Sequence, residues 1–401
     1  MHLHHRFLAV ASVLGLLAAA APQAVAGGDA VKIGILGDQS GQSADIGGNG
    51  SVLAARMAAE DVGGSVAGKR IEFVVADFNW NPDTAAAIAR QWFDQDGVDA
   101  IADLPVTPAA LAVQEIARVK QRVVLVTGAS SNDLTGRTCN PYTVHWADDN
   151  AAIANSTASA IIEDGGRQWF FLTADFGFGH AMQQAATDVI RARGGTVIGA
   201  AVHPINPGDF SPFLLSAQNS HAQIIALASV GTDTVNAISQ AHEFGISETG
   251  QRLAGLVVFE TDIHAIGLDK AQGLYVASGF YWDQNDQSRA WAGKFFARFH
   301  RMPTRDQAAT YAVVSQYLRA IDAAGTTDAA TVVRQMKRMP ASYFGRPASI
   351  RGDGRVLYDL TLYQVKAPDE SHGEWDLYRP IRTVAAADAF LPMQADRCNF
   401  K

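Results

Sequence analysis

The chain has 401 residues, of which 48% are hydrophobic and 18% are charged, so it has ample material for buried cores and lacks the composition of a disordered protein. Its 40 acidic and 32 basic residues give a formal net charge of −8, which argues against non-specific binding to nucleic acid and to anionic lipid, because both need a basic face. At about 100–200 residues per domain, the length predicts two to four domains or lobes.

The first 26 residues have the layout of a secretory signal peptide. Arg6 precedes an apolar run over residues 7–21, and Ala24-Val25-Ala26 supplies the small residues of a cleavage site. The run is shorter than the roughly 20 residues of a membrane-spanning helix, so a permanent anchor is the weaker alternative. We therefore expect cleavage after Ala26 and a soluble, exported mature protein.

Short, continuous apolar runs recur along the chain, and each has the length of a buried parallel strand. They cover residues 31–36, 71–76, 123–126, 169–173, 224–228 and 253–259. Helical patterns separate them; Asn81-Pro82-Asp83, for example, offers a cap candidate and a proline in the first turn. This alternation predicts right-handed βαβ units and open parallel sheets.

A polar, irregular stretch over residues 130–150 interrupts the alternation, which restarts at Trp169. The break favours two α/β lobes over a single large sheet. Beyond Asp286 the pattern becomes mostly helical, and it ends in a glycine-rich turn and a strand-like run. The helical patterns cover residues 290–300, 307–324 and 328–336, the turn covers 352–354, and the run covers 357–365. This last part is expected to pack on both lobes and not to form a third core.

Cys139 and Cys398 are the two cysteines of the chain. In an exported protein such a pair predicts a disulfide. Two unrelated thiols are the alternative, because the sequence does not show whether the two Cα atoms come within bonding distance. A metal site is discarded, since no C-x-x-C or H-x-x-H pattern accompanies them.

The sequence contains no recognisable motif for catalysis or for a cofactor. The G-x-G-x-x-G and G-x-x-x-x-G-K-[ST] fingerprints are missing, and Ser40 lacks a nucleophile elbow because Asp38 precedes it by two positions. His145, Asp148 and Asp149 lie close in sequence without a second histidine at i+4, so we interpret them as a surface segment between lobes and not as a metal site. We therefore expect no enzyme activity, no cofactor and no metal, and we favour binding over turnover.

Several motifs, taken in order, resemble those of one family. Residues 31–36 (VKIGIL) with Ser40-Gly41 resemble its first strand and loop, residues 128–135 (GASSNDLT) its post-strand loop, and residues 175–179 (DFGFG) its aromatic-G-x-G turn. The chain is in this respect similar to the type I periplasmic solute-binding proteins of ABC importers, in the branch of the leucine/isoleucine/valine receptors. The resemblance covers nearly all of residues 30–366.

The resemblance implies an α/β fold of two Rossmann-like lobes with parallel sheets, joined by a three-strand hinge. The crossings are expected near residues 146–148, 282–283 and 351–356. Lobe 1 then comprises residues 27–147 and 284–353, lobe 2 comprises residues 148–283 and 354–390, and residues 391–401 form a C-terminal tail. Ligands of such sheets bind at the carboxyl ends of the strands, which here meet at the cleft between the lobes.

The resemblance places Thr107 where the family uses a hydroxyl for the ligand carboxylate. Ala129 would offer backbone groups, and Ser130 or Ser131 a second hydroxyl. Hydroxyls and main-chain N–H groups hold a carboxylate without a counter-charge when each acceptor is satisfied, and a helix N-terminus adds to such a site. A simple N-cap role for Thr107 is the alternative.

The remaining candidates concern the body and the amino group of the ligand. Phe176 stands where amino-acid receptors usually have a tyrosine, so it can pack but cannot bond an ammonium group, and Val230 falls where a second aromatic occurs. Glu260 aligns with the carboxylate that receives the α-ammonium; Asp262 competes with it, and a solvated loop acid is the alternative. Tyr281 is either a cleft wall or a hinge-packing residue.

Together these features predict a periplasmic receptor that closes on a small carboxylate and delivers it, as a monomer, to ABC permease subunits. Apolar amino acids are one ligand class, aromatic or other organic acids are the other, and amides remain open. The rivals are a ligand-sensing protein of the same fold coupled to a membrane sensor, and an exported α/β hydrolase.

Overall fold

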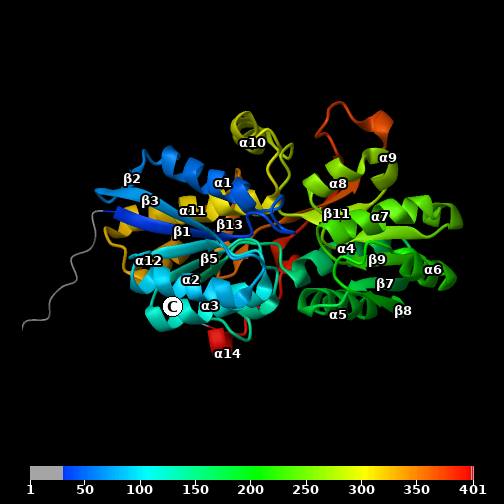
Figure 1. The fold of residues 1–401 in the computed structure, drawn as a ribbon, viewed down its shortest axis with the longest axis horizontal. Helices are drawn as coiled ribbons and strands as arrows, with labels where there is room; N and C mark the ends of the chain where they lie inside the picture. The colour runs from blue at the N-terminus through cyan, green and yellow to red at the C-terminus, as the bar shows by residue number, and fades with distance from the viewer. Residues whose placement is uncertain (1–29, 399, 401) are drawn as a thin grey trace, which may run out of the picture.

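The computed structural model describes residues 30–398 and 400, which form two α/β lobes lying side by side (Figure 1). The expected signal peptide, residues 1–26, lies outside the described residues. Within the described part of the chain, no helix combines the length and the apolar character needed to cross a membrane.

The sheet of lobe 1 has six strands in the order β2-β3-β1-β4-β5-β6, and all neighbours are parallel except β2 and β3. A small antiparallel sheet, β12-β13-β14, lies in the same lobe (Figure 1). The strands are β1 (Ala30–Gly37), β2 (Ser65–Val66), β3 (Lys69–Asp77), β4 (Ala100–Asp103), β5 (Val123–Val126), β6 (Thr143–His145), β12 (Ala341–Tyr343), β13 (Arg346–Ile350) and β14 (Val356–Leu357). The helices are α1 (Gly48–Asp61), α2 (Pro82–Asp94), α3 (Thr107–Lys120), η1 (Asn132–Thr135), α10 (Asp286–Phe299), α11 (Arg305–Ala324) and α12 (Ala329–Arg338).

The sheet of lobe 2 has seven strands in the order β16-β15-β11-β10-β9-β7-β8, of which β15 and β16 run antiparallel to their neighbours. The strands are β7 (Gln168–Ala174), β8 (Thr196–His203), β9 (Ile224–Ala228), β10 (Arg252–Gly255), β11 (Tyr275–Ser278), β15 (Leu360–Val365) and β16 (Tyr378–Val384). The helices are α4 (Asn150–Glu163), α5 (Gly177–Ala192), α6 (Ser211–Asn219), α7 (Thr232–Glu243), η2 (Ile246–Thr249), α8 (Glu260–Ile266), α9 (Leu268–Ala271), η3 (Pro368–Glu370) and α13 (Ala386–Ala389). The last helix of the described residues is α14 (Ala395–Cys398).

The two-lobed parallel α/β architecture confirms the predicted fold class, and the six apolar runs become β1, β3, β5, β7, β9 and β10. β8 is an additional strand at the edge of its sheet, where half-exposed and exposed residues alternate, so it lacks the continuous apolar run of a central strand. The last predicted run proves too long: β10 ends at Gly255, and residues 256–259 continue as a buried loop toward the other lobe.

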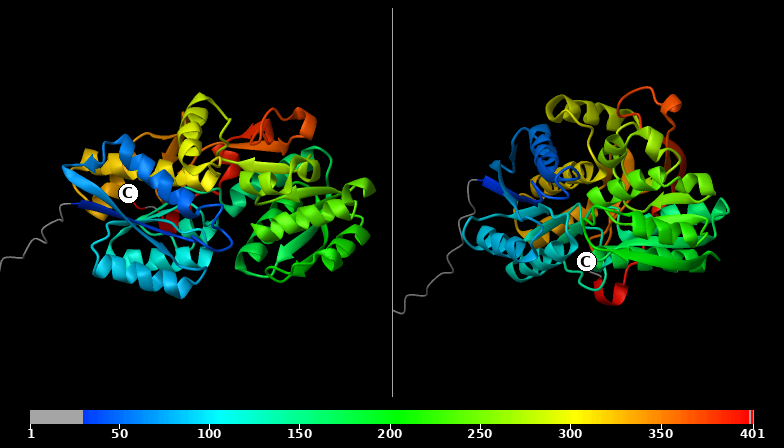
Figure 2. Two further views of the ribbon diagram at one scale, coloured as in Figure 1. Left: turned by 45° about the horizontal axis from the view of Figure 1, so that its top comes forward. Right: turned by 45° about the vertical axis from the view of Figure 1, so that its right-hand side comes forward.

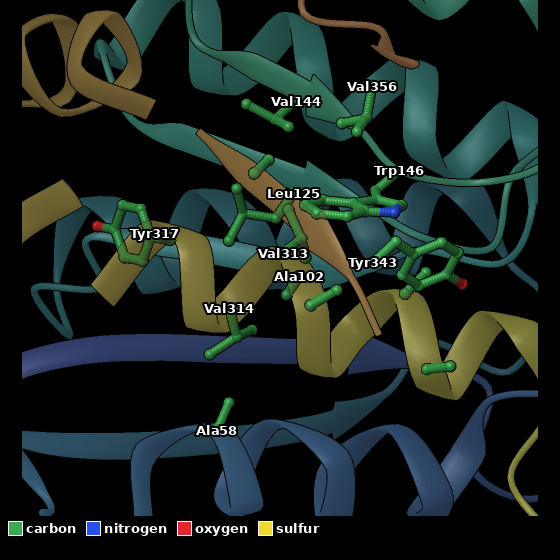
Figure 3. Packing of buried hydrophobic residues seen from close by; sticks show 14 of the residues in the cluster. Ala58, Ala102, Leu125, Val144, Trp146, Val313, Val314, Tyr317, Tyr343 and Val356 are labelled. Atoms are coloured by element: carbon green, nitrogen blue, oxygen red, sulfur yellow. The ribbon is translucent and has the colours of Figure 1, made fainter. Parts of the chain in front are cut away.

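Helix α11 anchors the core of lobe 1. Its side chains Val313, Val314 and Tyr317 are buried in one cluster with Ala58 of α1 and Leu125 of β5 (Figure 3). Each such side chain contributes about 1.5–3 kcal/mol when it is removed from water. This packing holds the N-terminus of α11 in place, and that end of the helix reaches the gap between the lobes.

The chain passes between the lobes after β6, after β11 and after β14, as two further views show (Figure 2). Asp148, in the first crossing, connects all three. Its Oδ2 accepts a hydrogen bond from the Gly279 N–H of the second crossing at 2.8 Å, and its Oδ1 accepts one from the Tyr358 hydroxyl of the third, also at 2.8 Å. Residues 351–356, where this crossing was predicted, form the turn between β13 and β14 and the first residue of β14. The third crossing therefore falls just beyond the predicted range.

The interpretation of His145, Asp148 and Asp149 as a surface segment is wrong, because all three are buried. Arg355, 210 residues beyond His145, donates to the ring Nδ1 at 3.0 Å and to Asp149 Oδ2 at 3.2 Å. The ring Nε2–H donates to the Ala129 carbonyl at 2.7 Å. Burial and the nearby guanidinium hold the pKa of His145 well below its ordinary value. The segment is a structural part of the hinge, which local sequence could not show.

The predicted disulfide between Cys139 and Cys398 is confirmed, with 5.8 Å between the Cα atoms. The bond joins positions 259 residues apart. It fastens the short C-terminal helix α14 beneath lobe 1, near α3 (Figure 1).

Candidate functional site

A cavity lies between the two lobes, at the carboxyl ends of β4 and β5. Most of its lining is apolar or aromatic, and the polar lining residues are Ser43, Thr107, Ser130, Asp148, Arg305 and Asp306. The lining residues are Ser43, Ile46, Trp80, Pro105, Val106, Thr107, Pro108, Gly128, Ser130, Asp148, Ile153, Phe176, Phe178, Val230, Val257, Phe259, Arg305 and Asp306.

The two lobes touch beside this cavity. Gln42 of lobe 1 donates from Nε2 to the Val230 carbonyl of lobe 2 at 3.3 Å. Gly231 follows with a φ of 62°, and a Cβ at this position would lie 3.1 Å from the Gln42 carbonyl oxygen, so glycine suits both the backbone and the close approach. The rings of Trp80 and Phe176 meet across the gap, with centroids 6.3 Å apart. A ligand in the cavity would therefore contact both lobes.

The hydroxyl end of the cavity, defined here as Thr107, Gly128 and Ser130, contains two of the predicted residues. β4 and β5 are parallel neighbours, so the loops that follow them open at the same edge of the sheet. Helix α3 begins at Thr107 with Val106 as its N-cap residue, and within the described chain no side chain caps it. The Thr107 hydroxyl is thus not an N-cap, and the unpaired N–H groups of the helix start add an attraction for anions.

Two other predicted neighbours of this end do not line the cavity. The Ala129 N–H donates to the Leu104 carbonyl at 3.1 Å, and its own carbonyl accepts from His145, so both backbone groups are engaged. Ser131 caps the short helix η1 and accepts from the Asp133 N–H at 3.3 Å. Of the two serine candidates, Ser130 is therefore the one at the cavity.

The apolar wall includes the predicted Phe176 and Val230, and it adds two aromatic residues that the sequence did not single out. The rings of Trp80 and Phe178 both lie close to that of Phe176, with centroids 6.3 Å and 5.6 Å from it. The Trp80 Nε1–H donates to Asp38 Oδ2 at 2.5 Å, which holds the indole ring in place. The sequence did offer a signal for Trp80. This residue directly precedes the helix cap Asn81 and follows the carboxyl end of β3, the edge of a parallel sheet at which ligands bind.

Glu260 and Asp262 are buried but do not line the cavity. Asp262 Oδ2 accepts from the Phe259 N–H at 2.9 Å and so completes the start of α8. Glu260 Oε2 has no hydrogen-bond partner among the described residues. Burial raises the pKa of each carboxyl to about 7. The alternative of a solvated loop acid is therefore wrong for both residues.

Tyr281 also lies away from the cavity, in the core of lobe 2. Its hydroxyl donates to the Trp375 carbonyl at 3.0 Å, and its ring packs against Tyr378 with centroids 4.9 Å apart. Tyr281 is therefore a packing residue of lobe 2 and does not form a wall of the cavity.

The charged end of the cavity, defined here as Asp148, Arg305 and Asp306, was not predicted as a site. Arg305 is the first residue of α11, yet its guanidinium reaches lobe 2, where Nη1 donates to the Val258 carbonyl at 2.9 Å and the group lies 4.0 Å from the centre of the Phe259 ring. Its Nε is 3.5 Å from Asp148 Oδ2. Arg305 therefore joins lobe 1, the hinge and lobe 2.

Carboxyl groups surround this single guanidinium. Burial raises the pKa of Asp306 well above its ordinary value; the positive charge of Arg305 opposes the shift, and the negative charges of Asp148, Asp103 and Glu260 add to it. The same neighbours, Asp148, Asp306 and Glu260, raise the pKa of Arg305 against the effect of its burial. The positive charge of Arg305 is thus already balanced by the protein.

Comparisons with known proteins agree with this arrangement. Residues 30–372 match the family model described as periplasmic binding protein. A solved periplasmic binding protein from Burkholderia mallei is 45% identical, with 92% of this chain and 98% of that chain covered and a TM-score of 0.88. A branched-chain amino acid ABC transporter periplasmic ligand-binding protein from Burkholderia xenovorans LB400 is 35% identical, with 90% and 97% covered and a TM-score of 0.83. The Leu/Ile/Val-binding protein homolog 6 of Brucella melitensis biotype 1 is 25% identical, with 85% of this chain and 89% of its own length covered.

Proposed function

The chain belongs to the periplasmic binding protein family, and we propose that it is the substrate-binding receptor of an ABC importer, exported with cleavage after Ala26 and acting in the periplasm. In this function the two lobes close on a small ligand, and the ligand stabilises the closed state because it contacts both lobes. The closed receptor then delivers the ligand to permease subunits.

The observation that carries the proposal is the position of the cavity: it lies between the lobes, and residues of both lobes line it. Its hydroxyl end offers Thr107, Ser130 and the start of α3, which together suit a carboxylate. Its wall is largely apolar, which suits a hydrocarbon body. We therefore propose a small carboxylate with an apolar or aromatic body as the ligand.

Two ligand classes fit this description. The names of the relatives from Burkholderia xenovorans and Brucella melitensis favour branched-chain amino acids. The three neighbouring rings of Trp80, Phe176 and Phe178 favour an aromatic acid, because offset or edge-to-face ring contacts contribute beyond the buried area. Apolar amino acids and aromatic acids are thus the two classes to be compared.

A binding role without turnover distinguishes this proposal from an exported hydrolase. A hydrolase needs a nucleophile with a base in hydrogen-bond reach. The hydroxyl residues that line the cavity are Ser43, Thr107 and Ser130, and no histidine is among the other residues that line it. Sensing by the same fold is a second use of the same binding step, and it differs only in the membrane partner.

The test is a thermal-shift screen of the purified protein against branched-chain and aromatic amino acids, benzoates, phenylalkanoates and their amides, followed by calorimetry of each hit. A ligand at 100 times its Kd adds about 2.7 kcal/mol to the stability of the folded state. Prolonged incubation followed by chromatography should return the acid unchanged. Steady product formation, or amides binding as tightly as their acids, would contradict the proposal.

A further inference from the structure

We propose that Asp306 is the acceptor for a positively charged amino group, so that the ligand carries an amine in addition to the carboxylate bound by Thr107 and Ser130. The inference rests on the proposed function and names the ligand class more closely. It also moves the amino subsite from Glu260, at the start of α8, to the start of α11.

The other carboxyl groups near Arg305 are used elsewhere. Both oxygens of Asp148 accept hydrogen bonds from hinge groups, at 2.8 Å each. Asp262 accepts from the backbone at the start of α8. Neither Glu260 nor Asp262 lines the cavity. Among the described carboxyl groups of this cluster, Asp306 alone lines the cavity without a hydrogen-bond partner on its side chain.

Asp306 is also not needed to start its helix. The capping box of α11 consists of Thr304 and Gln307: Thr304 Oγ1 accepts from the Gln307 N–H at 3.3 Å, and Gln307 Oε1 accepts from the Thr304 N–H at 3.1 Å. An acidic residue that only complements a helix dipole gains this benefit at the surface, without the cost of desolvation. Asp306 is only 5% exposed and faces the cavity, so a role in helix capping does not account for it.

The charge balance of this end favours a cation over an anion. One guanidinium faces the carboxyl groups of Asp148, Asp306 and Glu260. Arg305 is 3.5 Å from Asp148 and 4.0 Å from Asp306, so a ligand carboxylate placed here would meet two carboxyl groups for every guanidinium it gained. A protonated amine beside Asp306 would instead donate a hydrogen bond to its carboxyl group, which has no side-chain hydrogen-bond partner among the described residues. Carboxylate and amine are thereby assigned to two different groups of polar side chains that line the same cavity.

Trp80, Phe176 and Phe178 also line the cavity, and aromatic ring faces attract ammonium groups within about 6 Å. The raised pKa of Asp306 adds a measurable consequence, because a cation that binds there displaces the proton that the buried carboxyl holds.

The experiment compares matched acids with and without an amine, by calorimetry on the full mature protein. The pairs are leucine with 4-methylpentanoate, phenylalanine with 3-phenylpropanoate, and 4-aminomethylbenzoate with 4-methylbenzoate. In the best-bound pair, the amine-bearing acid should bind at least about tenfold more tightly. Its binding should also release a fraction of a proton, seen as different heats in two buffers of different ionisation enthalpy.

The variants separate the two candidate acceptors. Asp306→Asn should abolish the preference for the amine and change the affinity for the amine-free acid by less than about threefold, and Asp306→Glu should restore part of the preference. Glu260→Gln is the matched control and should leave the preference unchanged. The wild-type comparison does not depend on any variant folding.

Two results would overturn the inference and leave the proposed function standing: equal affinities within every pair for the wild type, or equal loss of both pair members in Asp306→Asn. Loss of the preference in Glu260→Gln alone would return the amino subsite to α8. If no acid of either kind binds, the proposed function itself fails, and the inference fails with it.

Discussion

The two polar ends of the cavity are built in different ways. The hydroxyl end uses short side chains and a helix start that directly follow two neighbouring strands, β4 and β5. The charged end assembles Asp148 from the hinge, Arg305 from α11 and the Val258 carbonyl from lobe 2. The first therefore belongs to one lobe, and the second exists only where both lobes and the hinge meet.

The difference suggests that the two ends contribute differently to ligand binding and to the stability of the fold. Neutral donors at the hydroxyl end bind a carboxylate without any cost from a buried counter-charge. Buried charges at the charged end depend on one another, because removal of one leaves the others uncompensated. We therefore expect the loss of Arg305 or Asp148, which join the lobes and the hinge, to alter the stability of the whole protein, and changes at the hydroxyl end to alter mainly binding.

The largest effect is expected for Arg305→Gln, which leaves the surrounding carboxyl groups without their guanidinium. Loss of one partner of a buried ion pair costs about 3–5 kcal/mol. Urea unfolding should show a loss of this size. Arg301→Gln is the matched control, since its ion pair with Asp45 joins side chains that are 50% and 71% exposed and should contribute less than about 1 kcal/mol. Equal losses in the two variants would remove the distinction between the ends.

The second prediction concerns the pH dependence of stability. Burial raises the pKa of Glu260 from 4.5 to about 7, so the folded protein holds this proton more tightly than the unfolded chain does. The resulting stabilisation is complete below pH 4.5 and is lost as the pH rises through about 7. Between pH 4.5 and about 7, the free energy of unfolding should therefore fall further for the wild type than for Glu260→Gln, by up to about 3 kcal/mol. Parallel curves would show that Glu260 does not titrate in this cluster.

The smallest effect is expected at the hydroxyl end. Thr107→Ala should weaken carboxylate binding by about 1–3 kcal/mol, the cost of an unpaired acceptor on the ligand, and should leave the unfolding midpoint nearly unchanged. Thr107→Ser keeps the hydroxyl and serves as the control in calorimetry. A loss of stability as large as that of Arg305→Gln would contradict the proposed separation of binding from stability.

The same difference explains how much of the molecule could be predicted. The resemblance to the family led to Thr107 and Ser130, which follow two neighbouring strands, although the strand before Thr107, β4, was not among the predicted apolar runs. Similarity to the family also led to Phe176 and Val230, which line the cavity. It led to Glu260 as well, but that residue lies at the start of α8 and does not line the cavity.

The charged end was missed because its members are far apart in the chain. Asp148 and Arg305 are brought together by the hinge and by the packing of α11, neither of which leaves a local pattern. The capping pattern Thr304 to Gln307 does mark a helix start, but it does not show that this start reaches a cavity. Likewise, Asp149 and Arg355 gave no sign of their contact across the hinge.

The most direct measurement of the central claim is a crystal structure of the protein with the tightest-binding acid from the screen. The account predicts that the ligand lies between the lobes, with its carboxylate oxygens at about 2.7–3.2 Å from the hydroxyls of Thr107 and Ser130. A carboxylate paired with the Arg305 guanidinium, or a ligand bound outside the cavity, would contradict it.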